Sequence, residues 1–189
     1  MRDISLHVLD IVENSVKAKA RLVSVSFSKE GNALTIVVDD DGCGMSKEML
    51  ENVKSPFTTS RTTRKVGMGI PLLTENAQLT GGDVKIESEI GRGTTLTALF
   101  YTDHIDCLPL GDLAATVQSL IIANPESPDF DFTAHSERGD GEIDTRQIRA
   151  LVDPLPLSEP DIISWIGSAA NEELVSILGG TNNENFSGT

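Results

Sequence analysis

The chain has 189 residues, 39% of them apolar, and a net charge of −14, a composition that supports a globular core and excludes a disordered chain. The negative charge argues against nucleic acid, and no apolar run approaches the ~18 residues of a spanning helix. Cys43 and Cys107 stand apart, and the N-terminus lacks an apolar signal core, so we expect a cytoplasmic protein without nucleic-acid or membrane partners.

The charge is distributed unevenly along the chain. Residues 1–100 carry 12 Lys/Arg and 13 Asp/Glu, whereas residues 101–189 carry 3 and 16 and contain no lysine. This shift predicts a boundary near Tyr101. We therefore expect a first unit over 1–101, a small acidic α+β unit over 102–180 and a disordered tail over 181–189.

The first unit alternates helical and strand patterns. Its expected elements are a helix over 4–20, strands over 23–28 and 34–39, a short helix opening at 46, a helix over 70–80, and strands over 84–89 and 94–101. Because the strands are mostly connected as hairpins, we expect a mixed, mostly antiparallel sheet with helices on one face. That is a two-layer α/β sandwich of the α+β class.

The second unit has weaker patterns. They predict a helix over 113–123, a hairpin of 130–136 with 142–144, and a helix over 159–178. Trp165 lies on that last helix among isoleucines, which makes the helix a candidate docking element. The alternative is that the helix simply packs onto the first unit.

Asp10 and Asn14 are the first residues that suggest chemistry. They stand four residues apart and therefore project from one face of the first helix. A carboxylate and an amide held there can orient a water and hold Mg²⁺, which prefers oxygen ligands. The alternative is an ordinary solvated helix face.

A second group follows the strand that ends near Asp39. Asp40 precedes Gly42, Gly44 and Met45, and glycines let the backbone turn tightly and approach a ligand. A carboxylate fixed at a strand end can accept a hydrogen bond from an exocyclic amine such as that of adenine. The alternative is a simple turn.

Gly67, Met68 and Gly69 stand directly before the helix that opens near residue 70. Free N–H groups at such a helix start stabilise phosphate. The polar loop before them carries Arg61 and Lys65, which suit a lid over phosphates, although a plain surface loop has the same composition.

Four ordered segments together resemble the GHKL superfamily, which includes DNA gyrase B, heat-shock chaperone ATPases, histidine kinases and mismatch-repair ATPases. They are LDIVENSVKAKA, similar to the N box; VVDDDGCGM, similar to the first glycine box; SPFTTSRTTRKVGMGIPLL, similar to the F box running into the second; and GRGTTLTALF, similar to the last box. The resemblance spans residues 4–101 and implies the Bergerat-type fold and ATP as the ligand.

The resemblance also implies a role for each matching residue. Asn14 coordinates Mg²⁺, and Asp40 binds the adenine amine. Gly42, Gly44 and Met45 belong to the base pocket, and Thr94 supports the adenine contact through water. Gly67, Met68 and Gly69 form the flexible lid and the phosphate-binding turn, and Arg61 or Lys65 contacts phosphate.

One position departs from the pattern, because Asp10 stands where these ATPases place a general-base Glu. The shorter side chain withdraws the carboxylate by about 1.5 Å, so an atypical general base favours ATP binding over hydrolysis. We also find no phosphoacceptor histidine in a dimerisation helix before the N box.

Two functions therefore compete. The first is a soluble signal-transduction kinase, similar to the anti-sigma-factor serine kinases, acting on an unknown protein partner. The second is an ATP-gated interaction module or slow ATPase. The sequence leaves open whether the protein forms a homodimer.

Overall fold

Six strands form one mixed sheet in this computed structural model, which describes residues 2–54 and 69–179. The order across the sheet is β3-β4-β2-β1-β5-β6, and every neighbouring pair is antiparallel except β1 with β5. The strands are β1 (Leu22–Glu30), β2 (Ala33–Asp40), β3 (Asp83–Glu89), β4 (Gly93–Tyr101), β5 (Asp129–Ser136) and β6 (Gly139–Asp144).

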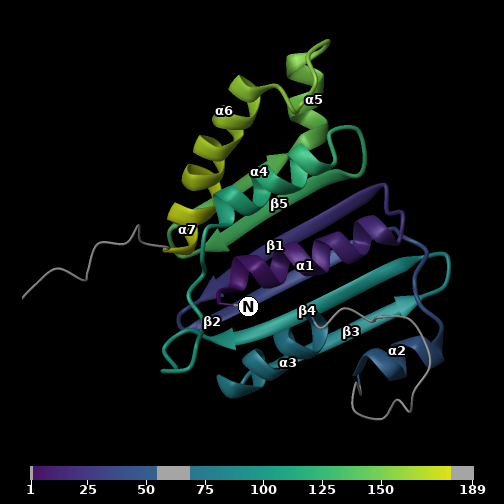
Figure 1. Cartoon of the computed structure of the whole chain (residues 1–189). Coiled ribbons are helices and arrows are strands. Elements are labelled where there is room, and N and C mark those ends of the chain that lie inside the picture. The colour runs from purple at the N-terminus through teal and green to yellow at the C-terminus, as the bar shows by residue number, and fades with distance from the viewer. Residues whose placement is uncertain (1, 55–68, 180–189) are drawn as a thin grey trace, which may run out of the picture.

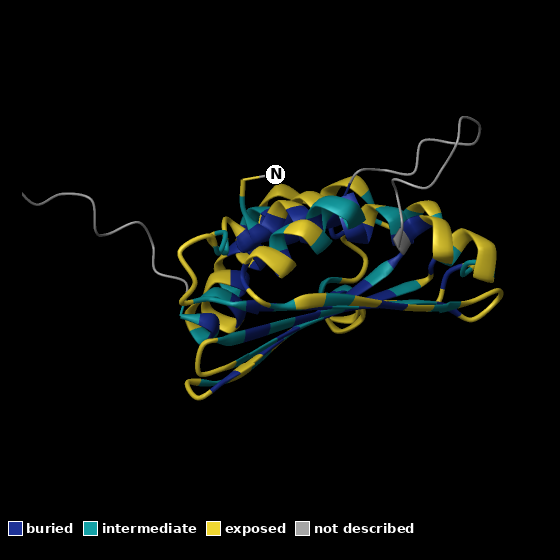
Figure 2. Ribbon diagram, turned by 90° about the horizontal axis from the view of Figure 1, so that it is seen from below, coloured by how far each residue is buried: buried dark blue, intermediate teal, exposed yellow. Residues whose placement is uncertain are grey.

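The helices all lie on one side of this sheet (Figures 1 and 2). They are α1 (Ile4–Lys17), α2 (Lys47–Lys54), α3 (Gly69–Leu79), α4 (Leu113–Ala123), α5 (Thr145–Val152), α6 (Pro160–Ala170), the π-helical turn η1 (Asn171–Val175) and α7 (Ser176–Leu178). The predicted two-layer α/β sandwich with a mixed, mostly antiparallel sheet is confirmed.

Alternation within the strands explains why one face is covered. In β1, Val23, Val25 and Phe27 are buried beneath the helices, while the serines between them are only half-buried. A period of two places such residues on opposite faces of a sheet. The helix-covered face therefore forms the core, and the opposite face is polar.

The start of α1 is held from two directions. The carboxylate of Asp3 caps the helix by accepting from the N–H of Leu6 at 3.0 Å. The N–H of Ile4 also donates to the carbonyl of Pro109 at 2.9 Å, in the segment between β4 and α4. Both interactions satisfy N–H groups that a helix start would otherwise leave without partners.

The sheet continues across the composition shift near Tyr101. Strand β5 pairs in parallel with β1, from Leu22 with Asp129 to Lys29 with Ser136. Four fully buried phenylalanines, from β1, β4 and β5, lie in the same core: Phe27, Phe100, Phe130 and Phe132. Residues on both sides of Tyr101 thus share one sheet and one hydrophobic core.

The C-terminal helices differ in detail from the predicted pattern. The helix expected over 159–178 is divided into α6, η1 and α7, and a short helix, α5, follows β6 without having been predicted. Asp144 starts α5 by accepting from the N–H of Arg146 at 2.8 Å. Within the part of the chain that the structure describes, no helix is long and apolar enough to cross a membrane.

Candidate functional site

Asp40 ends β2 as a buried carboxylate with both oxygens fixed. Its Oδ2 accepts from the hydroxyl of Ser15 on α1 at 2.7 Å, and its Oδ1 accepts from the N–H of Gly42 at 2.9 Å. Its exposed fraction is 8%. A carboxylate oxygen has more than one lone pair, so each retains acceptor capacity for an amine of a bound ligand.

Thr94 lies directly opposite Asp40 in the β2–β4 register. Its hydroxyl is 2.9 Å from Oγ of Ser88, which donates to the carbonyl of Gly93 and accepts from the N–H of Met45, both at 2.8 Å. Because Ser88 uses its proton on Gly93, Thr94 is the donor of their shared bond. The Thr94 oxygen therefore keeps lone pairs for a water or a base.

Asp41 anchors the turn that carries Asp40. Its carboxylate accepts from the backbone N–H groups of Arg21 and Leu22, at 2.6 and 3.0 Å. The Leu22 backbone bond is the principal cause that lowers the pKa of Asp41, together with the Arg21 interactions. The turn is thereby tied to the start of β1, and Asp40 is held beside α1.

The glycines of this turn permit close packing. A Cβ at Gly44 would lie 2.0 Å from the carbonyl oxygen of Glu89, and its φ of +64° is in the left-handed region. A Cβ at Gly42 would lie 2.8 Å from Oδ1 of Asp40. Gly44 therefore lets the turn lie against the β3–β4 hairpin, and Gly42 lies in contact with the Asp40 carboxylate.

Asp10 meets the start of α3. A Cβ at Gly69, the first residue of that helix, would lie 1.6 Å from Oδ2 of Asp10. A carboxylate is favoured at a helix N-terminus, where N–H groups and the helix dipole are positive. Asn14 lies one turn further along α1, so its side chain projects from the same face of the helix as Asp10.

His7 connects the same two helices in the core. It is fully buried, and its Nε2 lies 2.9 Å from the amide nitrogen of Asn76 on α3, which makes Asn76 the donor. Its Nδ1 has no partner among the described residues. Burial, followed by the positive N-terminus, lowers the pKa of His7. A neutral imidazole therefore helps to fix α3 against α1.

The structure brings several predicted residues together. Asp40, Gly42, Gly44, Met45 and Thr94 surround the end of β2, and Asp10 lies against Gly69. The predicted residues Arg61, Lys65, Gly67 and Met68 lie outside the described residues.

Three supporting residues were missed by sequence reasoning: Ser15, Asp41 and Ser88. A buried serine needs a hydrogen-bond partner, so the inward position of Ser15 on α1 was a signal that a partner existed. Nothing in the local pattern identified Asp40 as that partner.

Comparisons with known proteins find a matching family, similar sequences and a similar fold. Residues 2–104 match the family model described as "Histidine kinase-, DNA gyrase B-, and HSP90-like ATPase". The chain is 38% identical over 96 residues to Histidine protein kinase DivJ of Caulobacter vibrioides, covering 48% of this chain and 16% of that protein. It is 32% identical over 88 residues to Sporulation kinase C of Bacillus subtilis, covering 46% and 20%.

A third relative is Sensor histidine kinase WalK of Bacillus subtilis, 35% identical over 106 residues, which covers 51% of this chain and 17% of that protein. The chain thus spans at most 20% of the length of these three kinases. Among solved structures, the N-terminal domain of a DNA repair protein superposes with a TM-score of 0.51 over 76% of this chain and 52% of the other, at 16% identity. That similarity concerns the fold.

Proposed function

The chain belongs to the histidine kinase-, DNA gyrase B- and HSP90-like ATPase family, and on that premise we propose that it is a Mg-ATP-binding regulatory protein kinase. It transfers the γ-phosphoryl group of ATP to a serine or threonine of a partner protein, as the anti-sigma-factor serine kinases do. The observation that carries the proposal is the fixed, buried carboxylate of Asp40 opposite Thr94.

The Asp40 environment fits an adenine. Its carboxylate accepts the 6-amino group of the base, while Ser15 and the N–H of Gly42 hold it in one orientation. Preorganised acceptors of this kind lose little entropy when a ligand binds. The Thr94 oxygen accepts from a water that bridges to the ring.

The α1–α3 group fits a metal-bound triphosphate. Asn14 supplies an amide oxygen and Asp10 a carboxylate, the hard donors that Mg²⁺ takes, and the α3 N-terminus at Gly69 offers N–H groups to phosphate. Mg²⁺, when bound, neutralises charge on the β- and γ-phosphates. Asn14 is the residue that we assign to the metal.

Asp10 supports phosphoryl transfer over rapid hydrolysis. In the transfer, an acceptor hydroxyl loses its proton to Asp10, a bond forms between its oxygen and the γ-phosphorus, and the bond from that phosphorus to the β–γ bridging oxygen breaks to release ADP. Aspartate is one methylene shorter than glutamate, and general-base work depends on hydrogen-bond reach. A protein hydroxyl docked close to Asp10 meets that need better than a loosely held water.

The same residue favours a second candidate function, an ATP-gated interaction module or slow ATPase. In that case ATP binding orders a lid over 55–69, nearly all of which lies outside the described residues. Asp10→Glu tests whether the short side chain limits hydrolysis. If a short base limits hydrolysis, Asp10→Glu raises phosphate release from Mg-ATP at least about tenfold. An unchanged rate would mean that the length of this side chain is not what limits hydrolysis.

Calorimetric titration with Mg-ATP tests the nucleotide site. We expect Asp40→Asn to weaken binding by at least about tenfold, because one acceptor oxygen becomes a donor. The matched control is Asp39→Asn, which changes the neighbouring exposed carboxylate on the opposite side of β2. Equal affinity of Asp40→Asn and the wild type would refute the assignment of Asp40.

The kinase activity is tested with γ-labelled ATP. The protein is incubated with candidate partner proteins, and phosphoamino-acid analysis follows. Phosphoserine or phosphothreonine that the wild type produces and Asp40→Asn does not supports the proposal. Normal ATP binding without any labelled protein would favour the interaction module.

A further inference from the structure

Trp165 is the chain's single tryptophan, and its exposed fraction is 54% on α6. The helix packs into the core through Ile162, Ile163 and Ile166. The side-chain amide of Gln118 on α4 donates to the backbone carbonyl of Ile163 at 2.8 Å. This hydrogen bond fixes α6 beside α4. The indole therefore contributes little to the core and remains on the surface.

The direction of Trp165 follows from the same packing. A Cβ at Gly167 would lie 2.2 Å from the amide nitrogen of Gln118, so Gly167 faces α4. Two residues along an α-helix correspond to a rotation of about 200°. Trp165 thus lies on the side of α6 away from α4.

Carboxylates lie on either side of this indole along the helix. Asp161 is one turn before Trp165, and Glu172 is two turns after it, with Ser168 between; all are exposed. Residues three or four apart share one face of an α-helix, so Asp161 and Ser168 lie on the Trp165 side of α6, while Glu172 follows in η1. An exposed aromatic ring with a carboxylate at each end is an arrangement that suits a cationic side chain.

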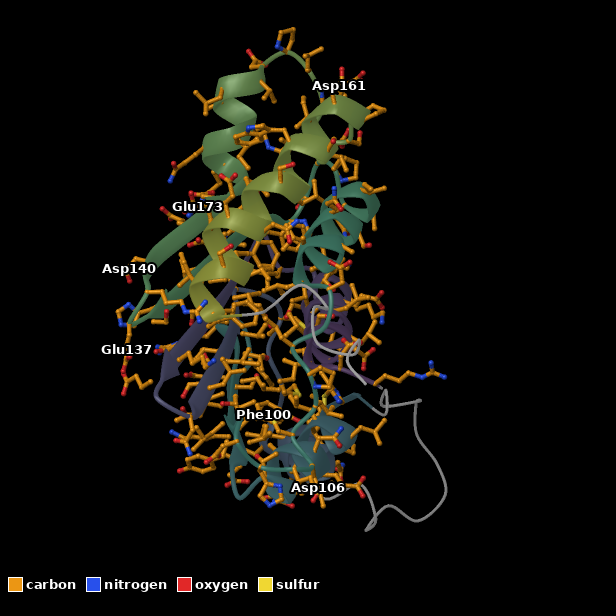
Figure 3. The ribbon with its side chains drawn as sticks, turned by 90° about the vertical axis from the view of Figure 1, so that its left-hand side faces the viewer. Phe100, Asp106, Glu137, Asp140, Asp161 and Glu173 are labelled. Carbon is orange, nitrogen blue, oxygen red and sulfur yellow. The ribbon has the colours of Figure 1, made fainter. Side chains whose placement is uncertain are left out.

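The acidic character continues toward the edge of the sheet. Glu173, next to Glu172, contributes to a hollow of about 550 Å³ on the β5–β6 hairpin, together with Asp140 and Glu142. Asp140 also hydrogen-bonds His135, and this bond raises the pKa of the imidazole. Figure 3 labels Asp161 near the start of α6, Glu173 beyond its other end and Asp140 on the β5–β6 hairpin. We call Asp161, Trp165, Glu172 and Glu173 the acidic face.

Cations near the C-terminal helices are already engaged, and Lys29 of β1 donates to the carbonyl of Leu178 at 3.1 Å. Residues 101–189 contain three basic residues, all arginines. Arg138 donates to the carbonyl of Ser176, Arg146 pairs with Asp144 at 2.9 Å, and Arg149 pairs with Asp129 at 3.1 Å. Among the described residues, no ion pair reaches Asp161, Glu172 or Glu173.

We propose that the acidic face is a docking surface for a basic, arginine-bearing segment of a partner protein. A guanidinium stacks on the Trp165 indole while Asp161, one turn away, accepts its N–H groups, and further basic side chains of the same segment pair with Glu172 and Glu173. Nucleic acids and anionic lipids are repelled by the same charges, and a second copy that presents the same face would bring carboxylates against carboxylates. Docking at this face requires no nucleotide, so its test is independent of the proposed nucleotide site.

The experiment uses the full chain and a synthetic peptide of alternating arginine and serine. Because Trp165 is the only tryptophan, its emission reports directly on this surface. We expect a saturable change in emission that weakens as salt is added, and a weaker effect of the matching lysine peptide. The absence of a saturable change would overturn the proposal.

Variants distinguish a specific surface from net charge. With a dye-labelled arginine peptide, anisotropy should show at least about tenfold weaker binding for Asp161→Asn/Glu172→Gln and about threefold weaker binding for Trp165→Ala. The control Glu48→Gln/Glu51→Gln removes two exposed charges from α2 and should bind as the wild type does. Equal losses in the two double variants would overturn the proposal, and circular dichroism verifies that each variant is folded.

Discussion

At the scale of single residues, the candidate site consists of one carboxylate, which we propose binds the base, and the side chains that hold it. Asp40 is fixed by Ser15 from α1 and by the N–H of Gly42, while Asp41 ties their turn to β1. A carboxylate with fewer supporting donors would sample several rotamers. The entropy lost in ordering it would then reduce the free energy of ligand binding. The supporting residues should therefore affect affinity although they are not expected to touch the nucleotide.

Ser15→Ala tests this idea. The substitution removes the 2.7 Å hydrogen bond to Asp40 and leaves the α1 backbone unchanged. We expect Mg-ATP affinity to fall by about five- to tenfold, since hydrogen bonds to charged groups contribute about 1.5–3 kcal/mol and water replaces part of that loss. Ser24→Ala on the polar face of β1 is the control. Titration calorimetry measures both, and equal affinities would show that Ser15 has no positioning role.

At the scale of elements, two contacts decide how the helices and the turn are placed. His7 joins α1 to α3, and the Gly44 turn lies against the β3–β4 hairpin. For each contact, a matched substitution isolates the physical cause of the predicted change in stability.

The buried His7 makes stability depend on pH. Its pKa lies below 6.5 in the folded chain, so the unfolded chain binds a proton that the folded chain excludes. The free energy of unfolding should therefore fall as pH decreases through about 6.5, by at most about 1.4 kcal/mol per pH unit. The raised pKa of His135 acts in the opposite sense, because its contribution is present below about 6.5 and is lost as pH rises.

Comparison with His7→Gln isolates the first effect, since His135 is common to both proteins. Urea denaturation between about pH 7.5 and 5.5 should show a steeper loss of stability for the wild type than for His7→Gln. Parallel stability curves would contradict the buried neutral imidazole.

Gly44 and Gly31 form a natural pair for the turn. Both have a positive φ, +64° and +57°, but a Cβ at Gly31 meets nothing within 4 Å, whereas a Cβ at Gly44 would lie 2.0 Å from the Glu89 carbonyl oxygen. Gly31→Ala should cost about 1 kcal/mol of unfolding free energy from backbone strain alone. Gly44→Ala should cost at least about 2 kcal/mol more, because the turn must move. Denaturation curves of equal midpoint would reject this explanation.

Local patterns predicted most of these elements. The helix expected over 113–123 is α4, and the strands expected over 23–28 and 34–39 are β1 and β2 with longer ends. Alternating apolar residues identify such strands because one face is buried. The π-helical turn at Asn171–Val175 had no local signal, since its sequence is compatible with an uninterrupted helix.

At the scale of the whole molecule, the position of β5 was beyond sequence reasoning. Phe130 and Phe132 alternate as a strand, but nothing in their neighbourhood indicates that their partner is β1, about a hundred residues earlier in the chain. The same limit applies to Ser15 and Asp40 and to Ser88 and Met45, which meet only after folding. Resemblance suggested the candidate site residues, whereas the side chains that hold them became visible only in the structure.

The shared sheet predicts that residues 1–104 are not independently stable. Without β5 and α4, strand β1 becomes an open edge, and the core loses Phe130, Phe132 and Leu120. We expect this fragment to aggregate or to unfold without cooperativity in thermal denaturation, and to bind Mg-ATP far more weakly than the full chain. A monomeric fragment that melts cooperatively at the same temperature would contradict this view.

The parallel pairing of β1 with β5 also has a consequence for biosynthesis. Strand β1 gains its second neighbour only when β5 is available, because Leu22 pairs with Asp129. Most of the chain must therefore have emerged from the ribosome before this pairing can form. During that interval β1 presents unpaired N–H and C=O groups to other nascent chains, and contacts of such wide separation form slowly. Chaperone dependence during translation should therefore be concentrated in the time between the emergence of β1 and that of β5.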